Sequence, residues 1–185
     1  MKTLIVLLVI TISSALAAPK KWPDVPYTNV VAYCYDYTQD ARGFSISFPD
    51  GILHKGVIKA TTIRLSDAQT KSLLKILNDD VEHERGEVEC YDPHHAFVFY
   101  DSNWKIVASI DICFLCENHS AVPKGVPELF DLQAMEDFCR QIGLPVHAES
   151  KQYTKLFLQE QPTKEPQAKE KQEQNKTSET ENPFD

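Results

Sequence analysis

The alternation of hydrophobic and polar positions is strongest between residues 96 and 114, where it predicts a β-hairpin. Residues 96–101 and 106–114 are rich in β-branched and aromatic side chains, and residues 101–103 between them have a turn-forming composition. The open end of this hairpin gathers three cysteines and two histidines: Cys90, His94, His95, Cys113 and Cys116. We therefore expect the rest of the chain to be arranged around this hairpin.

Two registers of the hairpin are compatible with the pattern. A three-residue loop that ends at Trp104 pairs Tyr100 with Ile106. A four-residue loop shifts the register by one residue, pairs Phe99 with Ala108 and exchanges the neighbours on each face. The last position of a three-residue loop favours a left-handed residue, usually Gly, so Trp104 leaves both registers open.

The register decides the environment of two phenylalanines. In the first register Phe97 and Phe99 share a face with the polar residues His95, Ser109 and Asp111. If helices cover the opposite face, the two rings form an exposed apolar patch, which is typical of a partner-binding surface. If the N-terminal strands or arm cover this face instead, both rings belong to the core.

Two helices are predicted from apolar residues at helical spacing. The first covers residues 65–79, with Ser66 as its N-cap and Gln69 completing a capping box. The second covers residues 131–142 and is ended by Gly143 and Pro145.

Further strands are expected at residues 30–37, 44–48 and 56–63, with a short last strand at 154–158. Residues 79–89 and 117–127 are polar enough to be loops. Strands in sets, each followed by a helix, indicate an α+β domain over residues 29–158. Its expected order is β-β-β-α-β-β-α, an antiparallel sheet with both helices on one face.

The two ends of the chain have the composition of segments outside the domain. Residues 1–17 combine Lys2, an apolar run and an A-x-A cleavage pattern, as in a signal peptide. Residues 18–28 are expected to form an irregular arm. Residues 159–185 are almost all polar or charged and are expected to be a disordered tail.

The signal-like segment predicts an exported protein, periplasmic or extracellular, with no membrane insertion after cleavage. The formal net charge of −8 disfavours binding to nucleic acid. Five cysteines in an exported chain favour disulfides, and the odd number leaves at least one thiol over.

The cysteines at the hairpin end are the best disulfide candidates, with Cys90 paired to Cys116 or to Cys113. Cys34 and Cys139 either pair with each other or remain buried thiols. The C-x-x-C pair at residues 113–116 ends a strand and precedes an acidic residue, whereas redox pairs of the thioredoxin type begin a helix. A structural disulfide is therefore favoured over a redox motif.

A zinc site is the alternative for the same cluster. Thiolate and imidazole ligands suit zinc, and the cluster supplies both from Cys90, His94, His95, Cys113 and Cys116. His119 lies close by in the sequence. In an oxidising compartment disulfides usually form instead, so no cofactor is expected, with Zn as the alternative. His95, Ser109 and Asp111 resemble a nucleophile triad in composition alone, because no G-x-S-x-G accompanies them.

Three short motifs carry a resemblance to known proteins. They are Cys-Tyr-Asp-Pro-His-His at residues 90–95, Val-Phe-Tyr-Asp at 98–101 and Ile-Cys-Phe-Leu-Cys at 112–116. This pattern resembles a loosely defined group of small exported bacterial proteins of unknown function. Members commonly have Gly at the position of Trp104. The resemblance implies a fold and a compartment, and no catalytic residue.

These observations favour a small exported α+β domain that is not an enzyme and acts by surface binding to an unknown protein or small molecule. The alternative is a zinc-binding or thiol–disulfide protein that uses the hairpin-end cluster. No catalytic residue is assigned.

Overall fold

The computed structural model describes residues 21–79, 81, 90–126 and 130–161. The predicted signal peptide and most of the predicted tail lie outside these residues.

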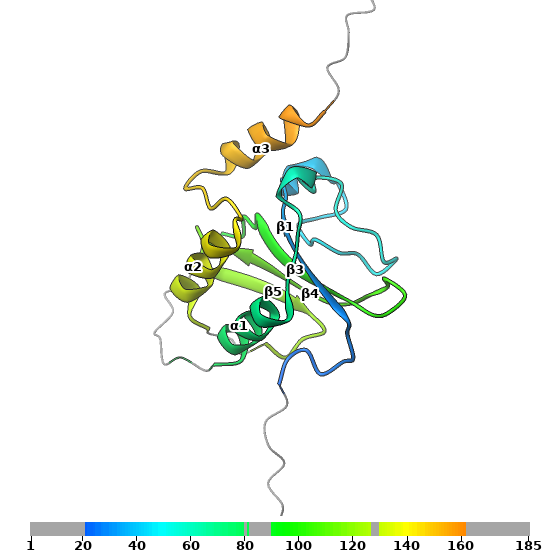
Figure 1. Ribbon diagram of the computed structural model, residues 1–185. Helices are drawn as coiled ribbons and strands as arrows, with labels where there is room; N and C mark the ends of the chain where they lie inside the picture. Colours follow the sequence, from blue (N-terminus) through cyan, green and yellow to red (C-terminus); the bar gives the residue numbers. More distant parts are fainter. Residues whose placement is uncertain (1–20, 80, 82–89, 127–129, 162–185) are drawn as a thin grey trace, which may run out of the picture.

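A five-stranded antiparallel sheet runs through the described part of the chain (Figure 1). Its strands are β1 (Asn29–Cys34), β2 (Ile63–Arg64), β3 (His95–Tyr100), β4 (Ile106–Cys113) and β5 (Asn118–Val122), in the spatial order β2-β1-β3-β4-β5. The helices are α1 (Asp67–Asn78), α2 (Leu132–Ile142) and α3 (Ser150–Gln159), with 3-10 turns η1 (Tyr37–Gln39) and η2 (Lys59–Thr61). The predicted α+β class is confirmed.

The first two helices form where the sequence predicted them. Ser66 caps α1 through the backbone N–H of Gln69, and the Gln69 side chain returns a bond to the Ser66 backbone, which completes the capping box. Asp131 caps α2, and Gly143 ends it with a φ of 93°, a left-handed conformation that glycine adopts without strain. Local signals at the helix ends were sufficient here because capping involves only neighbouring residues.

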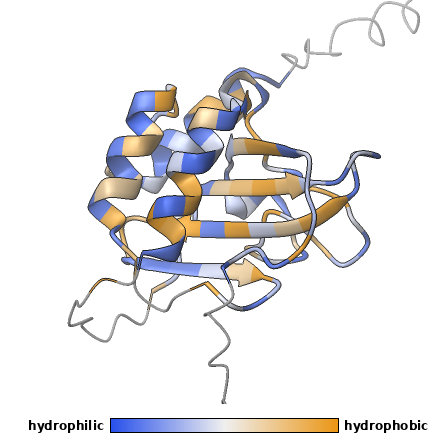
Figure 2. Ribbon diagram, turned by 60° about the horizontal axis from the view of Figure 1, so that its bottom comes forward, coloured by the Kyte–Doolittle hydropathy of each residue, from blue (hydrophilic) through white to orange (hydrophobic). Residues whose placement is uncertain are grey.

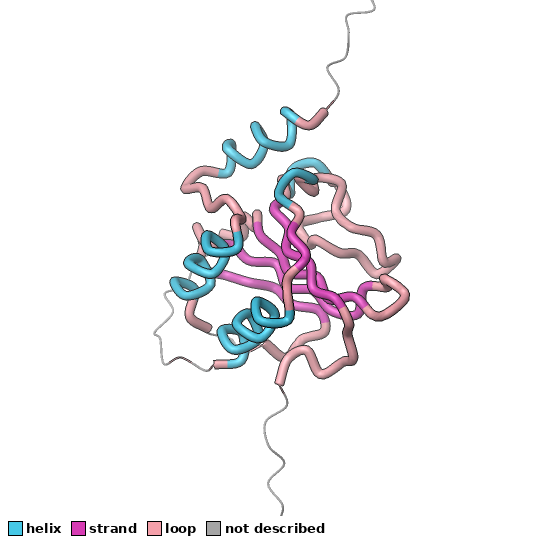
Figure 3. Tube along the Cα trace, in the orientation of Figure 1, coloured by secondary structure: helices cyan, strands magenta, loops and turns pink. Residues whose placement is uncertain are grey.

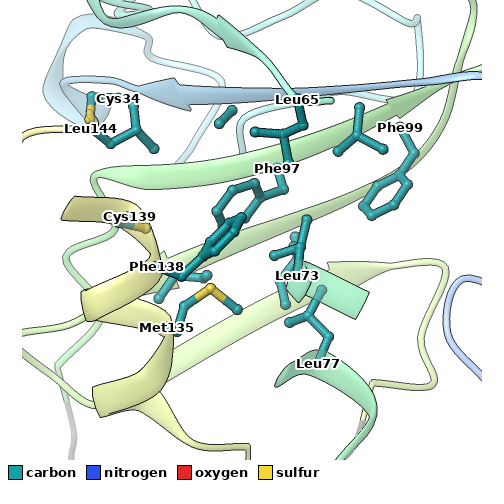
Figure 4. Close-up of a cluster of buried hydrophobic side chains, with 14 of the residues drawn as sticks. Cys34, Leu65, Leu73, Leu77, Phe97, Phe99, Met135, Phe138, Cys139 and Leu144 are labelled. Atoms are coloured by element: carbon teal, nitrogen blue, oxygen red, sulfur yellow. The ribbon is translucent and has the colours of Figure 1, made fainter. Parts of the chain in front are cut away.

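One face of the sheet is covered by α1 and α2, and the main core lies between them (Figures 1 and 3). Figure 4 shows Phe97 of β3 beside Phe138 and Met135 of α2, with Leu73 and Leu77 of α1 close by. All five of these side chains are buried.

The other face is covered by a long connection from Asp36 to Val57. Tyr35 and Ile46 pack there against Val98 and Tyr100 to form a second, smaller core. The strands expected at 44–48 and 56–63 are wrong, since the regular pairing in this region consists of the isolated bridges Tyr35–Val57 and Ser47–Leu53. The physical reason is that side chains, instead of a neighbouring strand, form hydrogen bonds with some of the backbone groups of this segment. For example, the carboxylate of Asp111 accepts the N–H of Ile46 at 2.9 Å.

Two predictions near the C-terminal half are also wrong. Part of the expected loop at 117–127 is strand β5, which follows β4 through a tight turn and pairs Cys113 with Asn118. The expected strand at 154–158 is instead part of α3. Tyr153, Leu156 and Phe157 of α3 contact the core, and their spacing of three and four residues is that of a helix.

The hairpin combines both predicted registers. Tyr100 pairs with Ile106, as in the three-residue loop, and Trp104 adopts a left-handed φ of 61°. The register then shifts, and Phe99 pairs with Ala108, as in the alternative. The extra residue is Val107, which forms a β-bulge. Each later residue of β4 therefore lies on the opposite face from the one that the three-residue loop predicts.

The exchange of faces removes the predicted binding patch. Phe97 and Phe99 both lie on the helix-covered face and are 0% exposed. The rings of Trp22 and Tyr27, from the arm, pack edge-on against Phe99 at 5.2 Å and 5.1 Å. The patch hypothesis is wrong, because the bulge places Phe97 and Phe99 on the same face as Ala108 and Ile110, and α1 and α2 cover that face. Figure 2 shows the apolar residues concentrated along the strands.

Candidate functional site

The open end of the hairpin carries a disulfide between Cys90 and Cys116. Their Cα atoms are 5.7 Å apart, and the bond joins the segment before β3 to the turn after β4. This is one of the two pairings that the sequence left open. Cys34 and Cys139 are buried free thiols, so of their two predicted alternatives the structure adopts the unpaired one.

Cys113 is a third cysteine at this end, and its thiol is free and buried. Its Sγ accepts the backbone N–H of Cys116 at 3.1 Å and that of Asp92 at 3.3 Å. Burial raises the pKa of the Cys113 thiol, while these N–H donors favour its thiolate and oppose the rise. The sulfur therefore lies between the two segments that the disulfide joins.

Asp92 and His94 form a polar pair beside a cavity of about 20 Å³. His94 Nδ1 lies 2.9 Å from the carbonyl oxygen of Tyr35, so Nδ1 carries a proton and donates it. Nε2 then faces Asp92 Oδ1 at 3.2 Å, and neither atom has a well-aligned hydrogen bond among the described residues. Burial lowers the pKa of His94, so the neutral ring presents a lone pair to the carboxylate.

Tyr153 of α3 covers this pair. Its ring stacks on His94 with the centroids 4.1 Å apart, and the ring of His95 meets it edge-on at 5.5 Å. The Tyr153 hydroxyl accepts the backbone N–H of His147 at 2.9 Å. His95 Nε2 lies 3.0 Å from the carbonyl oxygen of Pro145, to which it donates, and burial lowers the pKa of His95 to about 3. α3 thus holds both histidines neutral and shielded.

The predicted zinc ligands do not form a coordination shell. Cys90 and Cys116 are joined to each other, and His94 and His95 donate to backbone carbonyls. Across residues 21–79, 81, 90–126 and 130–161, no group of three or more His, Cys, Asp or Glu side chains is arranged to hold a metal ion. The ring of His119 packs against Phe130 at 4.8 Å. In its disulfide-bonded state this cluster is therefore a poor fit to zinc.

The three residues that resembled a triad are separated by the sheet. Ser109 and Asp111 face the long connection, where the Ser109 hydroxyl pairs with that of Ser47 at 2.7 Å. The Asp111 carboxylate accepts the hydroxyl of Ser45 at 2.8 Å, and burial raises its pKa to about 7. His95 lies on the opposite face, among the core residues. The arrangement is structural and has no nucleophile–base contact.

A groove at the other end of the hairpin was missed by the sequence reasoning. It has a volume of about 510 Å³ and lies between the loop at 47–51 and the start of β4. The guanidinium of Arg42 lies 3.9 Å from the centre of the Phe48 ring and supports that wall. The sequence signal in this loop is the alternation of apolar residues at 44, 46 and 48, which predicts a strand and gives no indication of a groove.

Lys105 and the first residues of β4 line one side of the groove. β5 reaches only Val122, which pairs with Ser109, and Pro123 follows with no N–H to donate. Lys105 to Ala108 therefore have no strand beside them on the β5 side within the part of the chain that the structure describes. Val122, at the end of β5, is 57% exposed and lines the groove.

Comparisons of the chain with protein-family models, with curated proteins and with solved structures found no match. No helix in the described residues is long and apolar enough to cross a membrane.

Proposed function

We propose that this protein is an exported binding domain, and that its groove takes an extended, apolar segment of a partner polypeptide. The single observation that carries the proposal is the groove of about 510 Å³ beside the part of β4 that β5 leaves uncovered. The signal-like residues 1–17 and the Cys90–Cys116 disulfide support export to the periplasm or the extracellular space.

An uncovered strand edge favours one kind of occupant. An extended segment placed beside Lys105 to Ala108 continues the sheet past Val122 and supplies partners for backbone groups on that edge. Affinity then comes from backbone hydrogen bonds, and specificity from the side chains that enter the groove.

The walls of the groove select for apolar side chains. Phe48, Pro49 and Ile106 line it together with Val122, while Lys105 and Asp50 place one charge of each sign among its lining residues. Alternate side chains of a bound strand face the same wall, so the favoured ligand has apolar residues at every second position. The groove thus replaces the patch of Phe97 and Phe99 as the proposed binding surface.

The proposal is tested by selecting linear peptides from a displayed random library against the purified protein. We expect enriched peptides with apolar residues at alternate positions, and NMR shift changes at the backbone amides of Lys105 to Ala108 on titration. Val122→Asp should weaken the binding of a selected peptide by tenfold or more without loss of stability, since Val122 is exposed.

Leu158→Asp is the matched control, because Leu158 of α3 is 58% exposed and lies outside the groove. This variant should bind the peptide as the wild type does. Equal binding by the two variants, or selected peptides that shift amides elsewhere, would contradict the proposal. A library that yields no ligand would contradict it too.

A further inference from the structure

The hairpin end contains a disulfide and a free thiol in close proximity, which is more than a structural cross-link requires. Cys113 Sγ lies 3.1 Å from the backbone nitrogen of Cys116, the residue whose own sulfur is bonded to Cys90. Cys113 Sγ thus contacts the backbone of the residue that carries one sulfur of the disulfide. Cys113 Sγ also lies 3.3 Å from the backbone nitrogen of Asp92, two residues after Cys90.

The three cysteines differ in exposure. Cys113 is 0% exposed and Cys116 is 1% exposed, whereas Cys90 is exposed. A free thiol on Cys113 or Cys116 is therefore shielded from other molecules, and a free thiol on Cys90 is accessible to them.

We propose that this protein carries a thiol–disulfide exchange activity, in which Cys113 displaces Cys90 from Cys116 and presents Cys90 to external disulfides. Cys113 first loses its proton to solvent. Its thiolate then attacks the sulfur of Cys116, the Cys113–Cys116 bond forms, the Cys90–Cys116 bond breaks, and Cys90 leaves as a thiolate. The step is an isomerisation, so it consumes no oxidant or reductant.

The backbone around Cys113 favours this step. The N–H groups of Asp92 and Cys116 point at its sulfur and stabilise the negative charge that the attacking thiolate carries.

The groups that face Cys113 determine how the step depends on pH. Burial and the Asp92 carboxylate raise the pKa of the Cys113 thiol. Tyr35, Tyr37 and Tyr91 also interact electrostatically with it, and neutral phenols add no charge near pH 8. The thiolate is thus a minor form at pH 7, and the exchange rate should rise about tenfold per pH unit while that remains so.

The resting state should keep the Cys90–Cys116 bond. This is the bond that the folded structure contains, and Cys113 is a free thiol in it. The isomer with a free Cys90 is accordingly a minor form. A reagent that alkylates Cys90 makes the exchange irreversible, so the alkylated form accumulates.

The second half of the activity is transfer to a substrate disulfide. The Cys90 thiolate attacks one sulfur of a small disulfide, forms a mixed disulfide with it, and releases the other half as a thiolate. The substrate class is an external disulfide, of low molecular weight or on a protein.

Peptide mapping tests the exchange directly. The native protein is incubated without reductant at pH 8.5 with N-ethylmaleimide, then denatured in acid and digested with trypsin. In the resting form, residues 86–105 and 106–124 stay linked, because trypsin cleaves after Lys105 between Cys90 and the other two cysteines. Exchange gives a free 86–105 peptide alkylated at Cys90 and a 106–124 peptide with an internal disulfide.

We expect alkylated Cys90 to accumulate at a rate that is independent of protein concentration. Cys113→Ser should abolish it, and Cys34→Ser, which removes a different buried thiol, should leave it unchanged. Incubation with oxidised glutathione in place of the maleimide should attach one glutathionyl group at Cys90 in the wild type and in Cys34→Ser, and none in Cys113→Ser.

The wild type alone is enough to overturn the proposal if Cys113→Ser does not fold. Persistent linkage of the two peptides, with no alkylated Cys90 after prolonged native incubation while the same sample exchanges in urea, would overturn it. A shift to a Cys90–Cys113 bond would also overturn it, because Cys116 rather than Cys90 is then released. A rate proportional to protein concentration would show attack between molecules and would contradict the internal step.

Discussion

At the scale of single residues, burial is the largest influence on the pKa values of His94 and His95, and it lowers both. His95 is 2% exposed, and its pKa falls to about 3 from an ordinary value of 6.5. A ring that is neutral in the folded state but takes up a proton in the unfolded state couples folding to pH. The same residue type that suggested a metal ligand thus becomes a source of acid instability.

We predict that His95 makes the protein less stable as the pH falls below 6.5. Between that pH and about 3 the unfolded state binds one more proton at this residue, so its contribution to the unfolding free energy falls by about 1.4 kcal/mol per pH unit. His95→Gln keeps a donor for Pro145 and removes the titration. The difference in unfolding free energy between wild type and variant should therefore decrease by this slope from pH 6 to pH 4 in urea melts.

Comparing the two proteins is necessary because Asp111 has the opposite effect. Its pKa is raised to about 7, so its contribution to stability is complete at low pH and is lost as the pH rises from about 4 to about 7. This term is common to both proteins and cancels in the difference. Parallel stability curves for wild type and His95→Gln would show that His95 does not titrate in this window.

At the scale of elements, the turn and the bulge of the central hairpin decide which faces its strands present. Trp104 takes the left-handed position of the turn, and Val107 is the extra residue of β4. A residue with a Cβ pays a steric penalty at that position, since its side chain approaches the following carbonyl. Trp104 offsets part of it by contacts with the ring of Tyr100 and the guanidinium of Arg64, each at 5.4 Å.

We predict that Trp104→Gly is more stable than Trp104→Ala by about 1 kcal/mol. Both variants lose the same side-chain contacts, and only alanine keeps the penalty of the left-handed backbone. The midpoints of urea denaturation measure the difference. Alanine and glycine variants of equal stability would mean that the turn relaxes to another conformation when the indole is removed.

At the scale of the whole molecule, α3 closes the end of the sheet where the cysteines and histidines gather. Tyr153 covers His94 and His95, and both carboxylate oxygens of Glu160 accept backbone N–H groups of η2, from Lys59 at 2.8 Å and Ala60 at 2.6 Å. The folded domain therefore extends beyond the boundary at residue 158 that the composition suggested. α3, including its last residue Gln159, belongs to the domain.

We predict that a chain ending at Gln161 keeps the melting temperature of the full chain, because residues 162–185 lack apolar anchors. A chain ending at Ala148 should lose much more, since it exposes two buried histidines and removes the caps of η2. In the full chain, Tyr153→Ala should cost about 3 kcal/mol, or about 10 °C in melting temperature. Calorimetry on the full chain, the two shortened chains and Tyr153→Ala checks this, and equal melting temperatures would show that α3 does not contribute to the stability of the domain.

The sequence by itself determined the features that depend on near neighbours in the chain. The capping box of α1 and the glycine that ends α2 follow from short patterns, and the α+β class follows from the order of the predicted elements. It also brought Cys90 and Cys116 together at the hairpin end, because a hairpin aligns its two strands whatever its register.

Only the tertiary structure decided which side chains are buried and which surfaces remain exposed to solvent. The bulge at Val107 decided that Phe97 and Phe99 are buried rather than exposed. The short apolar run in α3 is compatible with either a strand or a helix, and its contacts with the core favour the helix. The groove depends on where β5 ends beside β4, and the position of Cys113 between Asp92 and Cys116 depends on three segments meeting. Such contacts join residues far apart in the chain, and their energies depend on geometry that local composition does not specify.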